Sequence, residues 1–337
     1  MRIRKMLEEA NLSSVKESLS LHDVFLARKI IYQYLDKTPL KFYQSLSDLV
    51  GAEIWVKHEN HHSLGAFKVR GGLYLASMLS EKEKRAGLFT ASTGNHGQSI
   101  AFAAKTFGTT ATIAVPEKAN PAKVAAMQNL GGTVLFHGPN YDVARRWIRQ
   151  MADEKGGIFV GPTETALICG VGTYVLEIYE DLPDVDTIIV PVGGGSSAAA
   201  ACTVSKAINP DVEVIGAQSS GAPAAYLGWK EKKPMEAKMQ TFAEGVATTV
   251  SFDNTREIMA RHLDDFLMVD DSEIENAIIL YLKLIHNLAE GAGAIPLAAA
   301  LKHRSRFEGK KVVLVLSGGN LFMEKLRTII AKQRMRN

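Results

Sequence analysis

Short runs of β-branched and other apolar residues alternate with helix-like segments along most of this chain. Several runs are apolar at every position, which is typical of strands buried on both faces of a parallel sheet. The intervening segments are long enough for right-handed β-α-β crossovers. We therefore expect an α/β fold of open, mostly parallel twisted sheets flanked by helices. The expected strands are residues 53–56, 88–91, 110–115, 133–136, 187–190, 212–217 and 312–316.

Capping signals predict helices between these strands. Asn120 followed by Pro121 is typical of a helix N-terminus, and two glycines at 131–132 end that helix. Apolar residues at helical spacing predict further helices over 95–107 and 273–288. A length of 337 residues is enough for about two domains.

Composition and charge exclude several classes of protein. The 39 Lys and Arg residues nearly balance 36 Asp and Glu residues, so no nucleic-acid partner is expected. The two cysteines, Cys169 and Cys202, argue against a disulfide scaffold or a structural zinc site. Neither a signal peptide nor a membrane span is expected, because the start of the chain is charged and the longest uncharged stretch, 187–205, contains Pro191 and three glycines. We expect a cytoplasmic protein that acts on small molecules.

A lysine lies between two apolar residues in the segment LGAFKVRGG, residues 64–72. Lys68 follows Phe67 and precedes Val69, where loss of solvation would lower the pKa of the amine and leave it free to attack a carbonyl. The alternative is a surface lysine whose stem packs along its apolar neighbours.

Two further segments join the end of an expected strand to the start of a helix. In ASTGNHGQ, residues 91–98, backbone N–H groups at the helix N-terminus can hold a carboxylate or phosphate. In VPVGGGSSA, residues 190–198, three glycines let several N–H groups meet one dianion, with the Ser196 and Ser197 hydroxyls as extra donors. A phosphate that is bound but not transferred fits this segment best, because it lacks the nucleotide P-loop pattern. The alternative for each segment is an ordinary turn.

The fourth segment, LSGGN at residues 316–320, also follows an apolar strand and places a hydroxyl where open α/β sheets bind ligands. Together the four segments supply an amine, a phosphate cradle, an anion-binding loop and a neutral hydroxyl. These are the groups that bound pyridoxal phosphate requires.

In this order the motifs resemble those of the fold-type II pyridoxal-phosphate enzymes, most closely the threonine/serine dehydratase and serine racemase group. The resemblance extends from Thr38 to Asn320. It implies two domains with pyridoxal 5′-phosphate in the cleft between them. The large, cofactor-binding domain would be residues 1–86 and 164–337, and the small domain, residues 87–163, would carry the substrate loop. It also implies a homodimer.

The resemblance also assigns roles to matching residues. Lys68 matches the catalytic lysine that is joined covalently to the cofactor, and Phe67 packs beside it. Ser317 matches the residue beside the pyridine nitrogen, with Glu290 expected nearby. The implied substrate-carboxylate loop is Ser92, Thr93, Gly94, Asn95 and His96, of which Asn95 also contacts the cofactor's 3-hydroxyl, and the implied phosphate loop is Gly193, Gly194, Gly195 and Ser196.

The implied activity is an ammonia-lyase reaction that converts L-threonine and/or L-serine to a 2-oxo acid and ammonia by α,β-elimination. Lys68 would remove the α-proton. A serine beside the pyridine nitrogen leaves that nitrogen largely neutral, which favours elimination over transamination. Alternatives with the same cofactor are an amino-acid racemase or a lyase for phenylserine, hydroxyaspartate or diaminopropionate. A non-catalytic ligand-binding protein is a more distant alternative.

Several positions depart from the pattern of the group. Ala66 stands where serine is common, and Ser196 replaces a fourth glycine. Thr93 stands where racemases carry a catalytic serine and dehydratases often carry alanine. Gln218 occupies the place where the acidic residue of a divalent-cation site is expected, so we predict no metal there.

Three polar residues near the motifs have no assigned role. His61 and His62 are interpreted as part of a polar loop bordering the active site, in preference to a transition-metal cluster. Glu244 replaces an aspartate that is common in relatives, and its longer side chain could alter substrate choice.

Overall fold

The computed structural model describes residues 19–334, which form two compact units. Of the described residues, the first unit contains 19–36 and 68–173, and the second contains 37–67 and 174–334. Residues 1–18 and 335–337, which include the charged start of the chain and the end of its basic tail, lie outside the described part. The predicted α/β class is confirmed in both units.

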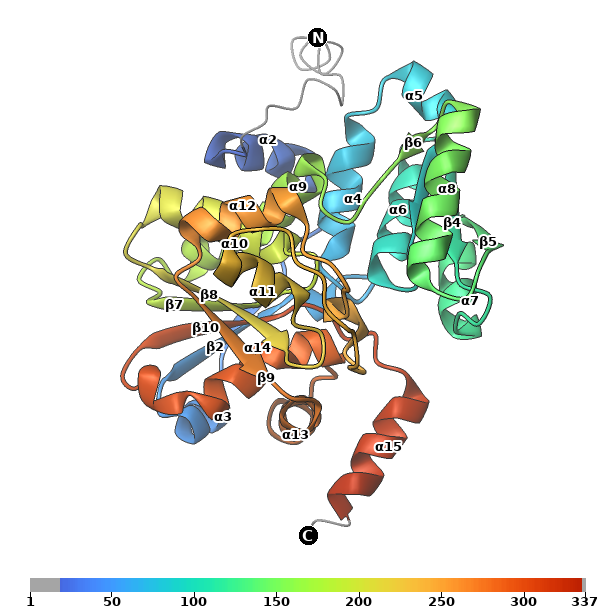
Figure 1. Ribbon diagram of the computed structural model, residues 1–337. Coiled ribbons are helices and arrows are strands. Elements are labelled where there is room, and N and C mark those ends of the chain that lie inside the picture. The colour runs from blue at the N-terminus through green and yellow to red at the C-terminus, as the bar shows by residue number, and fades with distance from the viewer. Residues whose placement is uncertain (1–18, 335–337) are drawn as a thin grey trace. The chain divides into compact units, whose positions relative to one another are not determined.

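The second unit is built on a six-stranded sheet in the order β1-β2-β10-β7-β8-β9 (Figure 1). Only β1 runs antiparallel to its neighbour, and the other pairings are parallel. Strands β10 and β7 are neighbours in the middle of the sheet, so their carboxyl ends lie next to each other at the same end of the sheet. The strands are β1 (Leu40–Phe42), β2 (Glu53–His58), β7 (Thr187–Pro191), β8 (Glu213–Ser219), β9 (Asp265–Val269) and β10 (Lys311–Leu316).

Helices cover both faces of this sheet. Helix α10 (Ser196–Ile208) packs on β7 and β8, and α12 (Asp253–His262) packs on α10. On the opposite face, α14 (Gly291–Lys302) packs on the central strands and shares a large apolar core with α13 (Asp271–Ile285) and α3 (Gln44–Val50) (Figure 1). The remaining elements are η2 (Glu59–His61), α11 (Ala224–Glu231), η3 (Glu244–Val246), η4 (Arg304–Arg306) and α15 (Met323–Arg334).

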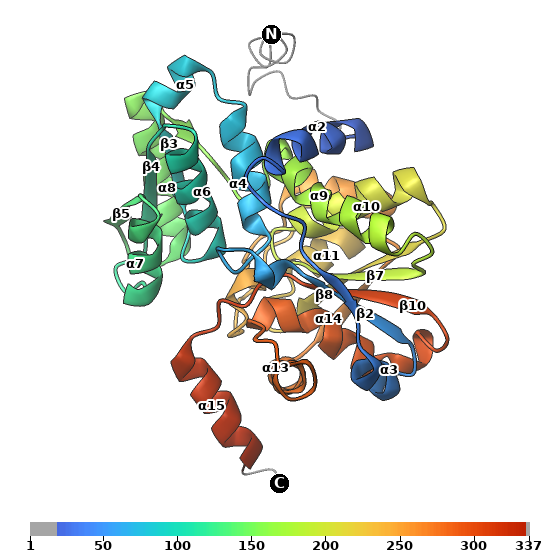
Figure 2. The same cartoon turned by 180° about the vertical axis from the view of Figure 1, so that it is seen from behind.

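The first unit contains a four-stranded parallel sheet in the order β5-β4-β3-β6. Helix α8 (Tyr141–Lys155) packs on one face, and α6 (Asn95–Thr106) and α7 (Pro121–Asn129) pack on the other (Figure 2). The strands are β3 (Leu88–Ala91), β4 (Ala111–Val115), β5 (Thr133–Phe136) and β6 (Ile158–Phe159). The other helices are α2 (Leu21–Ile31), α4 (Lys68–Ser77), α5 (Glu81–Ala86) and α9 (Thr165–Asp181), which crosses into the second unit.

Local sequence explains several helix boundaries. The Asn120 side chain accepts the N–H of Ala122 at the start of α7, as its position before a proline predicts. Asp270 caps α13 in the same way and forms a capping box with Glu273. That helix ends at Ile285, three residues before the predicted end, because His286 adopts a left-handed conformation with φ of 56°.

All seven expected strands are present, and three strands were not predicted. Strands β1 and β6 contain only three and two residues, too few to show a pattern. Strand β9 begins with a charged residue, Asp265, and was not recognised from its sequence.

The two units divide the chain differently from the ranges expected from the sequence. Residues 19–36, 68–86 and 164–173 belong to the first unit, because α4 packs against α2 and α6 and approaches α9 closely. A β-carbon on Gly72 would lie 2.2 Å from Ser99 Oγ, and one on Gly71 would lie 2.7 Å from the Leu167 carbonyl oxygen. Two glycines thus bring these helices together, which the strand pattern did not reveal.

None of the helices within residues 19–334 combines the length and apolar character that are needed to cross a bilayer.

Candidate active site

The segment before Lys68 is fastened to the segment that follows β10. The Phe67 N–H donates to the Ser317 carbonyl at 3.1 Å, and the Gly319 N–H donates to the Gly65 carbonyl at 2.9 Å. The Asn320 side-chain amide donates to the Leu64 carbonyl at 2.8 Å. Residues 64–67 and 316–320, about 250 residues apart in sequence, therefore meet in the second unit, and this contact fixes the backbone that leads directly into Lys68.

Lys68 begins α4 in the first unit. Burial lowers the pKa of its amine from 10.5 to about 8, as expected for an ammonium group that loses water. Its carbonyl oxygen accepts the hydroxyl of Ser99 from α6 at 2.6 Å, which fixes the first turn of α4 against that helix. The interpretation of Lys68 as a desolvated amine is therefore supported over a fully hydrated surface lysine.

The loop at residues 92–96 uses one of its own side chains to order its backbone. The Ser92 hydroxyl accepts the N–H groups of Gly94 at 3.1 Å and of Gly97 at 2.9 Å. A β-carbon on Gly97 would approach Ser92 to within 3.1 Å, so glycine is needed there. The Gly94 N–H is therefore already bonded within the loop itself.

His96 lies in the first turn of α6 with a buried, neutral side chain. Burial and, to a smaller extent, the nearby charge of Lys68 lower the pKa of the imidazole to about 3. Its Nε2 lies 3.4 Å from the Val160 carbonyl oxygen, which can only accept. The side chain therefore packs against its own unit, and the backbone N–H is the group that His96 can offer a ligand.

The three glycines after β7 allow the loop to pass close to neighbouring backbone. A β-carbon on Gly193 would lie 2.5 Å from the Gly245 carbonyl oxygen. Gly195 has a φ of +91°, a conformation that favours glycine, and its β-carbon would lie 2.9 Å from Thr255. Gly195 is also the N-cap of α10 and has no side-chain cap, so the N-terminus of this helix presents backbone N–H groups at the loop.

The two serines after the glycines differ in their surroundings. Both are almost fully buried. The Ser197 hydroxyl lies 2.8 Å from the Tyr174 hydroxyl, within the core of the second unit. This hydroxyl is therefore already paired with Tyr174 of α9, and the expectation that it is an extra phosphate donor stays a prediction. Ser196 remains a candidate.

Glu290 and Ser317 lie close together, as expected. The Glu290 N–H donates to the Gly318 carbonyl at 3.0 Å, and a β-carbon on Gly318 would lie 2.7 Å from Glu290 Oε1. The same carboxylate oxygen is 3.4 Å from the β-carbon position of Gly245, which in turn lies against Gly193. A continuous series of close contacts thus joins the Ser317 segment to the glycine loop.

The side chains of the histidine-rich segment, residues 58–62, form a cluster within the second unit. The rings of His58 and His61 stack at 4.6 Å, and His61 Nε2 lies 2.7 Å from Asn287 Oδ1. His62 is buried beside Glu59, at 3.4 Å. Within residues 19–334, no group of three or more His, Cys, Asp or Glu side chains is arranged to hold a metal ion.

Two residues that depart from the expected pattern also have defined places. Gln218 is fully buried at the end of β8, and its Oε1 accepts the Tyr226 N–H at 3.1 Å. The side chain therefore contributes a neutral amide where a cation would need a carboxylate. Glu244 is exposed at the start of η3.

Comparison with known proteins identifies the family. A model of the family described as pyridoxal-phosphate dependent enzyme matches residues 31–318. The chain belongs to this family. The enzyme class and the cofactor that the sequence motifs predicted are therefore confirmed, and so is the fold type implied by the resemblance.

Individual relatives extend this result. The chain is 37% identical over 317 residues to the L-threonine ammonia-lyase of Thermotoga maritima, a match that covers 93% of this chain and 79% of the relative. The structure of processed threonine deaminase isoform 2 from Solanum lycopersicum superposes with a TM-score of 0.86 at 28% identity, over 94% of both chains. Maize serine racemase gives a TM-score of 0.87 at 29% identity and covers 94% of this chain and 98% of its own.

The residues present fit a phosphorylated cofactor. The glycine loop has close backbone packing behind it, so added side chains at Gly193 or Gly195 would collide with neighbours. Sequence reasoning found the glycine loop but missed Thr255, which supports it, and Ser99, which holds the first turn of α4. Nothing in the local sequence marks these residues, since each acts on a segment far away along the chain.

Proposed function

We propose that the protein is a pyridoxal-phosphate-dependent ammonia-lyase that converts L-threonine and/or L-serine to a 2-oxo acid and ammonia. The observation that carries the proposal is the Lys68 amine, whose pKa burial lowers to about 8. It follows directly on Phe67, whose backbone is bonded to the Ser317 segment. The substrate class is supported by the relatives that are L-threonine ammonia-lyases at 36–37% identity.

In this proposal each motif has one task. Lys68 holds the cofactor through its amine, and that amine removes the α-proton when substrate displaces it. Bound pyridoxal phosphate supplies an electron sink that makes the α-hydrogen of an amino acid acidic. Phe67 would pack beside the cofactor, and Asn95, Ser317 and Glu290 are the residues that would hold its ring. The phosphate is bound by Gly193, Gly194, Gly195 and Ser196, and the substrate carboxylate by the loop Ser92, Thr93, Gly94, Asn95 and His96.

The substrate loop and the pyridine partner favour elimination. The N–H groups of Thr93, Asn95 and His96 suit a carboxylate at the N-terminus of α6. Ser317 is neutral, so it does not hold a proton on the pyridine nitrogen. Loss of the β-hydroxyl from threonine or serine then balances removal of the α-proton. Addition of water to the product releases ammonia and leaves the 2-oxo acid.

A panel of amino acids tests the proposal. The purified, cofactor-loaded protein is incubated with L-threonine, L-serine, D-serine, phenylserine, hydroxyaspartate and diaminopropionate, and 2-oxo acid, ammonia and enantiomer are measured separately. We expect 2-oxo acid and ammonia in equal amounts from L-threonine or L-serine. Lys68→Ala should abolish product formation, by about a thousandfold or more, while Lys311→Ala on the surface should not.

Two other outcomes would replace the proposal. Change of enantiomer without ammonia would assign a racemase, an alternative supported by the structural similarity to maize serine racemase. A protein that gains no absorbance band with pyridoxal phosphate would contradict the function altogether. A homodimer, implied by the resemblance, is part of the proposal and is tested by light scattering.

A further inference from the structure

A threonine outside the four motifs is bonded to the centre of the glycine loop. Thr255 lies in the first turn of α12 and is fully buried. Its hydroxyl oxygen lies 2.6 Å from the Gly194 carbonyl oxygen and 3.2 Å from the Phe252 carbonyl oxygen. The hydroxyl has one proton, and the shorter distance places it on Gly194.

This bond determines the direction of the next N–H group. The residues described here contain no cis peptide bond, and in a trans peptide the C=O and the following N–H point in opposite directions. When Thr255 holds the Gly194 carbonyl, the Gly195 N–H must point away from α12. That N–H belongs to the N-cap of α10, where the helix dipole favours an anion.

Without an anchor, this peptide would be free to rotate. It has glycine on both sides, and glycine occupies left-handed and right-handed conformations with similar ease. The neighbouring residues are already held, since the Val192 N–H donates to the Ala217 carbonyl at 2.8 Å and the Gly195 carbonyl accepts the Ala199 N–H at 2.8 Å. The Gly194–Gly195 peptide is the part of the loop whose orientation is held by the hydrogen bond from Thr255.

Thr255 also limits the space behind the loop. A β-carbon on Gly195 would lie 2.9 Å from both Cβ and Oγ1 of Thr255 and 3.2 Å from the Met259 methyl carbon. Thr255 therefore contacts Gly195 on the side that faces α12, and the Gly195 N–H points to the opposite side.

We propose that Thr255 is a positioning residue that orients the Gly195 N–H toward the phosphate of the cofactor. The inference rests on the proposed function, because it takes residues 193–196 as the phosphate loop. It predicts that the Thr255 hydroxyl contributes to affinity for the phosphate group and not for the rest of the cofactor.

Binding to the apoprotein separates this role from a general structural one. Dissociation constants for pyridoxal phosphate, pyridoxal and inorganic phosphate are measured by titration calorimetry on wild type, Thr255→Val and Thr255→Ser. Valine keeps the shape and removes the hydroxyl, whereas serine keeps the hydroxyl. The matched control is Thr203→Val, which removes a similar hydroxyl bond, 2.9 Å long, to the Ala199 carbonyl within α10.

We expect Thr255→Val to raise the dissociation constants of pyridoxal phosphate and inorganic phosphate by about tenfold to a hundredfold. This is the range for the loss of one hydrogen bond to a charged group. Pyridoxal should change by less than about threefold, and Thr255→Ser and Thr203→Val should resemble wild type in all three titrations. Thr255→Ala replaces the valine variant if that protein does not fold.

The outcomes distinguish this inference from the proposed function. If Thr255→Val weakens the binding of pyridoxal and of pyridoxal phosphate equally, or weakens neither, the positioning role is overturned. The proposed enzyme function would still stand in that case. Thr255-dependent binding of inorganic phosphate in a protein that forms no chromophore would support the cradle and contradict the proposed function. Failure of Thr255→Ser to restore phosphate affinity would also overturn the inference.

Discussion

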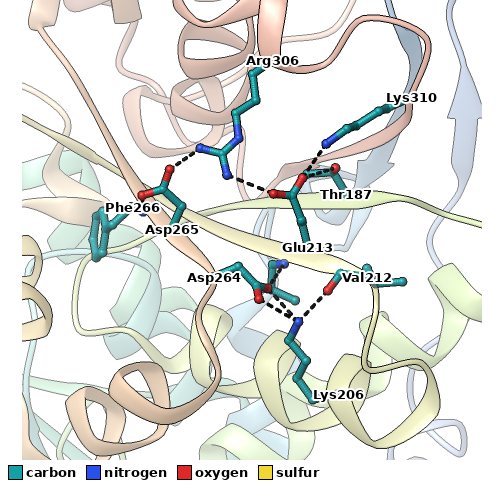
Figure 3. A network of polar contacts seen from close by, with 10 residues as sticks. Thr187, Lys206, Val212, Glu213, Asp264, Asp265, Phe266, Arg306 and Lys310 are labelled. Carbon is teal, nitrogen blue, oxygen red and sulfur yellow. Dashed lines mark hydrogen bonds and ion pairs between the residues drawn. The ribbon is translucent and has the colours of Figure 1, made fainter.

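The two ends of the six-stranded sheet in the second unit are built from different chemical groups. At the amino ends, Glu213, Asp265 and Lys311 begin β8, β9 and β10. Arg306 bridges Glu213 and Asp265, and Lys310 pairs with Glu213 at 2.7 Å (Figure 3). These side chains are about one-third exposed, so water screens their charges.

At the carboxyl ends, backbone groups take the place of charged side chains. Strands β7 and β10 run directly into glycine-containing segments, where N–H and C=O groups bond to one another or remain directed at a ligand site. The charged pair here, Lys57 and Glu177, is fully buried and joined at 2.6 Å. At the amino ends of the strands, charged side chains pair with one another. At the carboxyl ends, backbone N–H groups are placed where open α/β sheets bind ligands.

The largest effect on stability should come from the buried pair. Lys57→Met would leave Glu177 buried without its cation and should lower the free energy of unfolding by about 3–5 kcal/mol. Urea denaturation measures the loss. The control is Lys311→Met, which removes an exposed partner of Asp184 at the amino end. A loss as large for Lys311→Met as for Lys57→Met would contradict the contrast between the two ends.

The Lys68 amine should respond to pH near neutrality. Its pKa is lowered to about 8, so the amine is protonated and unreactive well below pH 8 and becomes neutral as pH rises. The rate at which apoprotein joins pyridoxal phosphate should therefore rise with pH and be half-maximal near pH 8. At that pH a lysine with the ordinary pKa of 10.5 would have ~150-fold less neutral amine than Lys68. Stopped-flow absorbance measures the rate, and a midpoint above pH 10 would show that burial does not act on Lys68.

A methyl group added at each end should separate binding from stability. In Gly193→Ala the new methyl group would collide with the Gly245 carbonyl oxygen. This variant should lower the free energy of unfolding by about 1–3 kcal/mol and weaken the binding of pyridoxal phosphate. Gly309→Ala, in the turn before β10, has open space but a φ of +72°, so it should cost about 1 kcal/mol through backbone strain alone. Calorimetry should show unchanged cofactor affinity for Gly309→Ala. Equal affinities in both variants would argue against the glycine loop as the phosphate site.

The smallest effect should come from the bridging arginine at the amino end. Arg306→Met removes two partly exposed ion pairs and should lower the free energy of unfolding by at most about 1 kcal/mol. The difference from wild type should shrink further in high salt, because salt screens exposed charges. Cofactor affinity should not change, and a change would mean that the two ends are coupled.

The sequence predicted the site better than it predicted the supports of the site. Lys68, the glycine loop and the Ser317 segment could be proposed from sequence alone because strand ends, glycines and an isolated lysine are local signals. The pairing of the Ser197 hydroxyl with Tyr174 was not predicted, since it depends on the packing of α10 against α9. The end of α13 was placed too late, because a histidine in left-handed conformation carries no clear signal in sequence.

By itself, the sequence determined the α/β class, most strands and the order of the chemical groups, because periodicity and turn residues act over a few neighbours. Only the tertiary structure decided that residues 64–68 meet 316–320, that α4 belongs with α6, and that Thr255 holds Gly194. Each of these contacts joins segments distant along the chain. Their free energy comes from burial and close packing, which exist only once the chain has folded.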